Sequence, residues 1–274
     1  MKNGVPSLVK WAGGKKQLLG QFEQFFPKKI ENYFEPFVGG GTVAFFLLKT
    51  HQEIKKIHLS DINEELVIAY NVVKNNIDEL VSLLKEYKIK HNKEFYYKIR
   101  AGDIKNLTPV QIAARFLYLN RTCFNGLYRV NSRGTFNVPI GSYKNPSICN
   151  EEDLREISKL LQKDDIMVSQ FHNAVSTAKK GDFIYFDPPY YPLKKESFTT
   201  YTKDNFLERE QERLAELFKE LDKKGCKVML SNSDSDFIKN LYKGYNIHFV
   251  RATRMINCDA TKRGAINEVV VTNY

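Results

Sequence analysis

The sequence has no long apolar run and no segment typical of an export signal. No uninterrupted apolar stretch approaches the roughly 18 residues that a membrane-spanning helix needs, and the apolar run at 43–48 is followed at once by a lysine. Lys10, Lys15 and Lys16 lie near the N-terminus without an apolar segment before them. We therefore expect a cytoplasmic protein without a membrane partner.

Cysteine and histidine are scarce and widely spaced. The cysteines form no CxxC pair and the histidines form no HxxxH or HExxH arrangement. Zinc sites and disulfide frameworks rely on such spacings, so we expect neither, and no metal. Buried free thiols are the expected state of the four cysteines. They are Cys123, Cys149, Cys226 and Cys258.

Acidic residues are absent from the whole stretch between Asp103 and Glu151, in a chain with a formal charge of +10. Basic and aromatic residues are interleaved there: Lys105, Arg115, Phe116, Tyr118, Arg121, Phe124, Tyr128, Arg129, Arg133, Phe136, Tyr143 and Lys144. Guanidinium groups suit phosphates and base edges, and aromatic rings can stack on bases. The stretch therefore predicts a nucleic-acid surface, with a core role for the rings as the alternative.

The rest of the chain has the pattern of an α/β protein. A length of 274 residues fits two small domains, or one domain that carries a large insertion. Apolar runs typical of buried strands occur at 33–35, 57–60, 166–168, 183–186, 228–230, 247–250 and 269–272. Helical patterns occur at 42–49, 64–75, 77–87 and 209–223, the last with Gly225 as its cap. This alternation predicts a mostly parallel sheet covered on both faces, with an antiparallel edge pair at its end.

A glycine-rich loop lies between the first expected strand and the first expected helix. Gly39, Gly41 and Ala44 match the G-x-G-x-x-G/A spacing of a Rossmann-type loop, which brings the backbone close to a nucleotide-containing cofactor. Asp61 closes the next strand, where a carboxylate can accept hydrogen bonds from ribose hydroxyls. Enzymes that use a nicotinamide cofactor share this loop, so the cofactor stays open at this point.

The strand at 183–186 runs directly into Asp187-Pro188-Pro189-Tyr190. The carboxyl ends of strands form the active crevice of an open α/β sheet, so this segment is expected beside the cofactor. Two prolines hold the turn rigid and present the Asp187 carboxylate and the Pro188 carbonyl as two fixed acceptors. Such a pair suits an exocyclic NH2 group.

Adenine N6 is a poor nucleophile because its lone pair is delocalised into the ring. Two acceptors on its hydrogens would stabilise the positive charge that develops during attack on an electrophilic methyl group. Tyr190 can stack on the base. At the start of the chain, Trp11 and Lys15 flank a glycine pair and offer a flat face and a cation for a carboxylate.

Together these motifs resemble those of the Dam-type DNA adenine-N6 methyltransferases, including the methylases of GATC restriction-modification systems. The similarity covers essentially the whole chain and is carried, in order, by KWAGGK, FEPFVGGGTVAF, SDIN, NRTCFNGLYRVNSRGTFNVPIGSYKNP, YFDPPY and LSNSD. It implies a Rossmann-like catalytic domain at 1–62 and 160–274 that binds S-adenosyl-L-methionine. It also implies an inserted helical and β-hairpin target-recognition domain at 63–159 that binds double-stranded DNA.

The resemblance also implies roles for individual residues. Catalysis would fall to Asp187, Pro188 and Tyr190, and the cofactor contacts to Trp11, Lys15, Phe37, Gly39, Gly41, Asp61 and Asp187. DNA contacts would come from Lys10, Phe124, Asn125, Leu127, Arg129, Pro139 and Tyr143, with Phe124 near the gap left by a flipped adenine. At 170–173 the sequence reads QFHN, where the family leads us to expect an acidic residue, so no residue is assigned to the adenine end of the cofactor pocket.

The leading hypothesis is a site-specific methyltransferase that flips adenine from a GATC site and methylates N6 by direct transfer. A cognate restriction endonuclease is a possible partner. Three alternatives stay open at this point. The acceptor could be RNA adenine, cytosine N4 or a protein glutamine amide; the chain could be an inactive methyltransferase fold that binds DNA; or it could be a nicotinamide oxidoreductase.

Overall fold

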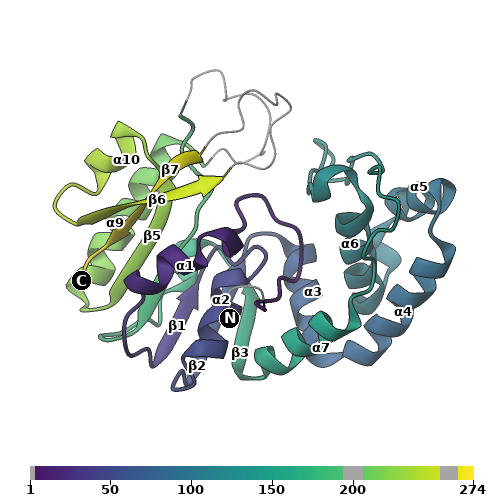
Figure 1. The fold of residues 1–274 in the computed structure, drawn as a ribbon, viewed down its shortest axis with the longest axis horizontal. Coiled ribbons are helices and arrows are strands. Elements are labelled where there is room, and N and C mark those ends of the chain that lie inside the picture. The colour runs from purple at the N-terminus through teal and green to yellow at the C-terminus, as the bar shows by residue number, and fades with distance from the viewer. Residues whose placement is uncertain (1–3, 194–205, 254–264) are drawn as a thin grey trace.

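A seven-stranded sheet forms the centre of the larger part of the molecule (Figure 1). The computed structural model describes residues 4–193, 206–253 and 265–274. The strand order is β3-β2-β1-β4-β5-β7-β6. The strands are β1 (Asn32–Glu35), β2 (Lys56–Asp61), β3 (Asp164–Val168), β4 (Phe183–Phe186), β5 (Lys227–Ser233), β6 (Asn246–Thr253) and β7 (Ala265–Thr272). All seven predicted strands are confirmed.

Strands β1 to β5 pair in parallel, as the alternation of strands and helices predicts. Strand β7 pairs antiparallel with both β5 and β6, so it lies inside the sheet and β6 forms the edge. The antiparallel pair is therefore confirmed.

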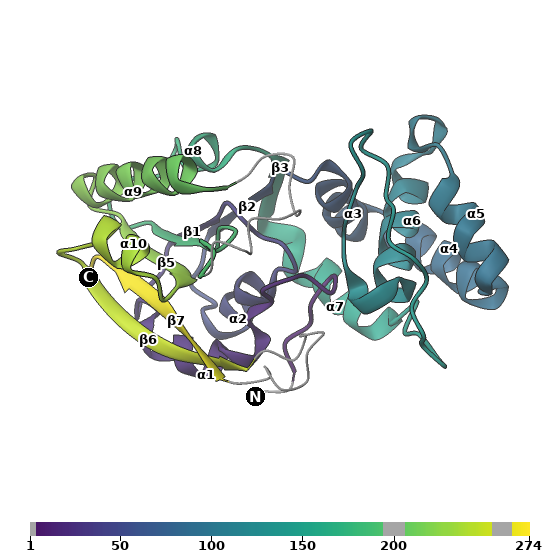
Figure 2. The same ribbon diagram turned by 90° about the horizontal axis from the view of Figure 1, so that it is seen from above.

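Alternate residues of the buried strands face two separate cores. Tyr33 and Tyr185 belong to one apolar cluster, and Phe34 and Phe186 belong to the other. Helices cover both faces, with α1 (Leu19–Phe22) and α2 (Thr42–Thr50) on the first side and α8 (Phe171–Ala174), α9 (Glu208–Lys223) and α10 (Asp236–Leu241) on the second (Figure 2). Helix α9 ends where predicted, with Gly225 at a φ of 78°.

A helical unit is inserted between β2 and β3 and lies to one side of the sheet (Figures 1 and 2). It consists of α3 (Glu64–Asn75), α4 (Ile77–Lys90), α5 (Lys93–Ala101), α6 (Pro109–Thr122) and α7 (Glu151–Leu160). Helix α6 is central because α3, α4 and α5 all pack against it. Short 3-10 turns complete the chain at Lys15–Gln17, Glu23–Phe25, Ile104–Asn106, Phe124–Gly126 and Leu161–Lys163.

A hairpin follows α6. Val130 bridges to Phe136, and the amide of Asn131 donates to the carbonyl of Thr135 over 2.9 Å. Gly134 has a φ of 77°, which the tight turn requires. Residues 130–135, which form the tip of this hairpin, are all exposed.

Two expectations concern membranes and metals. Within the described ranges, the helices are too short or too polar to cross a membrane. The same residues include no group of three or more histidine, cysteine or acidic side chains that could hold a metal ion. Cys123 and Cys226 are buried free thiols as expected, Cys149 is partly exposed, and Cys258 lies outside the described residues.

Candidate active site and nucleic-acid interface

The predicted catalytic and cofactor residues meet at the carboxyl edge of the parallel strands. Strand β1 leads into the glycine loop, β2 ends at Asp61, and β4 leads into Asp187. These three strands are neighbours in the sheet, so the parallel pairing alone brings their ends together. The N-terminal segment passes between the sheet and the helical unit and reaches the same edge (Figure 1).

The glycine loop adopts backbone angles that favour glycine. Gly39 and Gly41 have φ values of 47° and 71°, and Gly41 precedes the first residue of α2. A Cβ atom on Gly39 would lie 2.6 Å from Cδ1 of Trp11, and one on Gly41 would lie 2.5 Å from the Tyr70 hydroxyl. Glycine at 39 therefore lets the Trp11 ring lie directly on the loop.

The side chain of Asp61 forms hydrogen bonds with the glycine loop. Its carboxylate accepts the amide of Gly39 over 3.1 Å and the amide of Asn63 over 3.0 Å. Burial raises the pKa of Asp61, and these backbone amides oppose the effect. Hydrogen bonds to ribose hydroxyls, expected from the sequence, would use the remaining lone pairs of the two oxygens.

Two side chains, those of Lys15 and Ser231, contact the same oxygen of Asp187, Oδ1. Lys15 Nζ lies 2.7 Å from Asp187 Oδ1, and the Ser231 hydroxyl donates to the same atom over 2.9 Å. Lys15 is only 4% exposed and also donates to the carbonyl of Gly13 over 2.7 Å. A buried ammonium group needs such partners to offset the loss of its hydration.

The turn after Asp187 is fixed by side chains from β5, β7 and α9. Gln211 donates to the carbonyl of Pro189 over 2.9 Å, and Asn232 accepts the amide of Tyr191 over 3.1 Å. The Tyr190 hydroxyl donates to Glu268 over 2.8 Å, which holds the ring in place. Lys15 Nζ lies 4.9 Å from the centre of the Tyr190 ring. The rigid turn expected from the two prolines is therefore held by the rest of the fold as well.

Glu35 is a titratable group beside this site that sequence reasoning missed. It ends β1, is 3% exposed, and accepts the Tyr33 hydroxyl over 2.7 Å. Burial raises its pKa to about 8, and the charge of Asp187 acts in the same direction. It stands in the FEPF motif, but a single glutamate at the end of a strand carries no signal of burial.

An aromatic cluster surrounds Phe37, which lies at the start of the glycine loop. The Phe37 ring stacks on Phe171 with 5.7 Å between centroids and meets Phe206 edge-on at 5.6 Å. Phe171 opens α8 in the segment where an acidic residue was expected. His172 follows, and its Nδ1 atom is buried without a hydrogen-bond partner in the described part of the chain. The sequence analysis assigned no residue of 170–173 to the cofactor.

The predicted DNA-contacting residues lie around the turn after α6. Phe124 is 48% exposed, Tyr143 is 37% exposed, and the amide of Phe124 donates to the carbonyl of Pro139 over 2.9 Å. Lys10 reaches this group from the N-terminal segment, with Nζ 4.3 Å from the centre of the Tyr143 ring. Asn125 is exposed and has a φ of 54°.

Leu127 and Arg129 follow on the way into the hairpin, and both are half-buried. The Arg129 Nε atom donates to Asn137 on the opposite arm of the hairpin over 2.7 Å. This bond fixes one edge of the guanidinium group. The structure therefore brings the predicted residues into one region, while their contacts with DNA stay a prediction.

The acid-free stretch as a whole is not a nucleic-acid surface. Phe116, Tyr118 and Phe136 are buried, and Arg115 is buried in an ion pair with Glu65 at 3.0 Å. For these residues the alternative interpretation, a core role, is correct. Arg115, Phe116 and Tyr118 lie on α6, and Phe136 packs on Tyr128 in the same apolar core.

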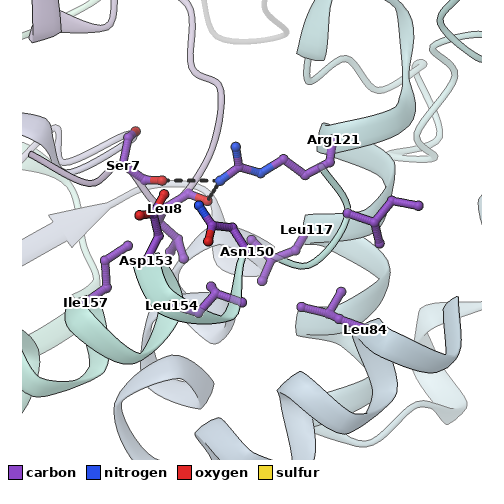
Figure 3. A pocket seen from close by; sticks show the side chains of 10 residues that line it. Ser7, Leu8, Leu84, Leu117, Arg121, Asn150, Asp153, Leu154 and Ile157 are labelled. Carbon is purple, nitrogen blue, oxygen red and sulfur yellow. Dashed lines mark hydrogen bonds between the residues drawn. The ribbon is translucent and has the colours of Figure 1, made fainter. Parts of the chain in front are cut away.

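Arg121 is also structural. Its guanidinium donates to the carbonyls of Ser7 and Leu8 over 3.2 and 2.8 Å, at the side of a crevice of about 10 Å³ (Figure 3). The preceding residue, Asn120, is 2% exposed. Its side-chain amide accepts from the Lys10 backbone amide and donates to the Lys10 carbonyl, each over 2.8 Å. These two side chains tie the N-terminal segment to the helical unit.

Comparisons with known proteins agree with this geometry. The family model of the D12 class N6 adenine-specific DNA methyltransferases matches residues 11–256. The type II methyltransferase M.MjaIII of Methanocaldococcus jannaschii is 47% identical, over 98% of this chain and 99% of that protein. M1.LlaDCHI of Lactococcus lactis subsp. cremoris is 44% identical, over 100% and 97%. The DNA adenine methylase of Escherichia coli K12 is 34% identical, over 96% and 94%. The chain belongs to the D12 class of N6 adenine-specific DNA methyltransferases.

Proposed function

We propose that this chain transfers a methyl group from S-adenosylmethionine to N6 of an adenine that is flipped out of a GATC site in double-stranded DNA. The observation that carries the proposal is the carboxylate of Asp187, which stands on a rigid turn at the carboxyl edge of the sheet, beside the glycine loop and Lys15. Membership of a DNA adenine methyltransferase family leaves the other acceptors, an inactive fold and a nicotinamide enzyme without support.

The charged and hydrogen-bonding groups around the glycine loop fit S-adenosylmethionine. Asp61 would accept ribose hydroxyls, Lys15 would pair with the amino-acid carboxylate, and Asp187 would accept from the ammonium group. Gly39 and Gly41 lack the side chains that would block a close backbone approach. Trp11 and Phe37 supply apolar rings at the two sides of the loop. When bound, the cofactor supplies a methyl group on a positively charged sulfur.

The protein's contribution to the reaction is to position and stabilise the amino group of adenine. Asp187 and the Pro188 carbonyl would accept the two N6 hydrogens, which favours a more tetrahedral nitrogen and stabilises its developing positive charge. Tyr190 would stack on the base, with its ring held by the bond to Glu268. Transfer is direct and in line, so no covalent enzyme intermediate is required.

The target adenine must leave the duplex because N6 cannot reach the cofactor while the base is stacked. Phe124 would border the vacated position, since its ring is exposed beside Asn125 and Pro139. Arg129 would read guanine O6 and N7 in the major groove. Lys10, Leu127 and Tyr143 would position the duplex around these residues.

We further propose that residues 63–159 act as the target-recognition domain and that 1–62 and 160–274 form the catalytic domain. The helical unit and hairpin between β2 and β3 support this division. Two relatives are named type II methyltransferases, which supports a cognate restriction endonuclease as partner. The cytoplasm, where such an endonuclease would threaten unmodified DNA, is the proposed place of action.

The test is to express the chain in cells that lack adenine methylation and to map modified adenines on a plasmid. N6-methyladenine confined to GATC is expected, and an Asp187→Ala variant of equal abundance should leave the plasmid unmodified. Modification of a different sequence would overturn the GATC assignment while leaving the adenine chemistry intact. Activity of Asp187→Ala within a few-fold of the parent would overturn the proposed mechanism.

A further inference from the structure

The Asp187 carboxylate lies at the end of a chain of two hydroxyl groups. The Tyr185 hydroxyl lies 2.8 Å from Ser231 Oγ, and Ser231 Oγ lies 2.9 Å from Asp187 Oδ1. A serine hydroxyl has one hydrogen, and a carboxylate can only accept. Ser231 therefore donates to Asp187, and Tyr185 must donate to Ser231.

Strand pairing dictates this contact. In the parallel pair of β4 and β5, Tyr185 is opposite Met229 and Phe186 is opposite Leu230. The next step of the same register places Ser231 beside Asp187. Tyr185 and Ser231 are both fully buried, so water does not compete for these hydrogen bonds. Buried hydrogen bonds in series polarise and strengthen each other.

Both side-chain donors of Asp187 act on Oδ1, since Lys15 bonds that atom too. Among the described residues, no side chain or amide donates to Oδ2. One oxygen of the carboxylate is thus occupied by the protein, and the lone pairs of the other are left for a ligand. Rotation of the carboxylate would exchange the two oxygens and break both bonds.

We propose that Ser231, supported by Tyr185, is a positioning residue that fixes the carboxylate of Asp187 so that Oδ2 accepts a hydrogen from adenine N6. The inference rests on the proposed catalytic role of Asp187. Without the hydroxyl, Lys15 alone holds Oδ1, and a single contact does not fix the plane of the carboxylate. Small misplacements of a reacting group can cost about 10²-fold in rate.

The strand provides a matched control. Ser233 lies two residues after Ser231 on β5, so its side chain is on the same face, and it is 5% exposed. Its hydroxyl has no hydrogen-bond partner in the described part of the chain. Ser231→Ala and Ser233→Ala therefore remove the same atom from similar surroundings, but only the first removes a contact with Asp187.

The experiment measures single-turnover methyl transfer on a GATC duplex with saturating S-adenosylmethionine, for Ser231→Ala, Tyr185→Phe, the double variant and Ser233→Ala. We expect Ser231→Ala to lower the rate about 10- to 100-fold, with DNA affinity close to that of the parent. Its melting temperature should fall modestly, because the Tyr185 hydroxyl loses its buried acceptor. Tyr185→Phe should cause a smaller loss, because Ser231 still reaches Asp187. The double variant should match Ser231→Ala, since Tyr185 acts only through Ser231. Ser233→Ala should stay within about two-fold of the parent.

A parental rate for Ser231→Ala, or losses that multiply in the double variant, would overturn the inference. Equal rate losses in both serine variants, with matching falls in melting temperature, would also overturn it and assign the serines to strand packing. Asp187→Ala distinguishes a failure of the role proposed for Ser231 from a failure of the proposed mechanism. If that variant is inactive and Ser231→Ala is not impaired, only this inference fails; if Asp187→Ala is active, the proposed mechanism fails with it.

Discussion

The buried carboxyl group of Glu35 makes the stability of the protein depend on pH. Glu35 ends β1 beside the site, and burial raises its pKa to about 8 from an ordinary value of 4.5. The hydrogen bond from Tyr33 and the charge of Lys15 oppose this rise, and the charge of Asp187 adds to it. At neutral pH the folded protein therefore holds Glu35 in its protonated, uncharged form.

The sign of the effect follows from proton binding. Below a pH of about 4.5 Glu35 is protonated in the folded and the unfolded chain, and it contributes no pH dependence. Between about 4.5 and 8 the folded chain keeps a proton that the unfolded chain has lost, so stability falls as pH rises. Each pH unit in this range lowers the free energy of unfolding by about 1.4 kcal/mol, so this free energy falls by about 3 kcal/mol between pH 5 and pH 7.

Glu35→Gln removes the titration and preserves the shape of the side chain. We expect urea unfolding at pH 5, 6 and 7 to show the variant gaining about 3 kcal/mol over the parent across this range. Other titrating groups, such as Asp61, are common to both proteins and cancel in the difference. Glu31→Gln is the control, because Glu31 lies just before β1 but is exposed and paired with Lys55 at 2.7 Å. A difference between Glu35→Gln and the parent that does not change with pH would refute the reasoning.

Three further outcomes test the nucleic-acid interface. Phe124→Ala should slow methylation of a normal duplex more than that of a duplex with an abasic site opposite the target adenine, because less unstacking is then required; equal slowing would assign Phe124 to packing. Arg129→Ala should relax discrimination at one base pair by about 1–3 kcal/mol across single-base variants of GATC; a uniform loss would indicate a phosphate contact instead. DNA affinity should fall steeply with salt, with a log–log slope of about −0.9 for each neutralised phosphate; a nearly flat slope would contradict a DNA-binding surface.

The sheet could be predicted from the sequence because parallel strands buried on both faces are short apolar runs. Phe183–Phe186 is such a run, and all four residues are buried. The position of β7 between β5 and β6 could not be predicted. An antiparallel hairpin can join a sheet through either of its strands, and the choice depends on side-chain packing that no local pattern records.

The acid-free stretch was harder to interpret because composition does not separate core from surface. Phe116 and Phe124 are both phenylalanines near arginines, yet one is buried in α6 and the other is exposed after it. A helix signal was present in the sequence. Thr108 and Gln111 form a capping box around Pro109, which begins the helix. Helical spacing from that point would have assigned Phe116 to the core.

The roles of Ser231 and Glu35 could not be predicted for a different reason. Both residues stand in motifs that carry the family resemblance, LSNSD and FEPF. Their roles depend on burial and on neighbours from an adjacent strand: Ser231 contacts Tyr185 and Asp187, and buried Glu35 interacts with the charge of Asp187. The sequence predicts Lys15 as a ligand for a carboxylate, and the structure pairs it with the carboxylate of Asp187. The sequence prediction concerned a carboxylate of the cofactor and stays a prediction, whereas the pairing with Asp187 within the protein could be identified only from the tertiary fold.

The N-terminal segment joins the proposed DNA surface to the proposed active site within a few residues. Asn120 holds the backbone of Lys10 against the helical unit, where the Lys10 side chain meets Tyr143. Five residues later, Lys15 bonds Asp187. Five residues span at most about 18 Å even when fully extended, so a shift of the segment at one anchor is transmitted to the other over a short length of chain. Trp11, packed on Gly39 between these anchors, ties the same segment to the glycine loop. The position of Lys10 at the proposed DNA surface and the position of Lys15 on the carboxylate of Asp187 are therefore set by one piece of backbone.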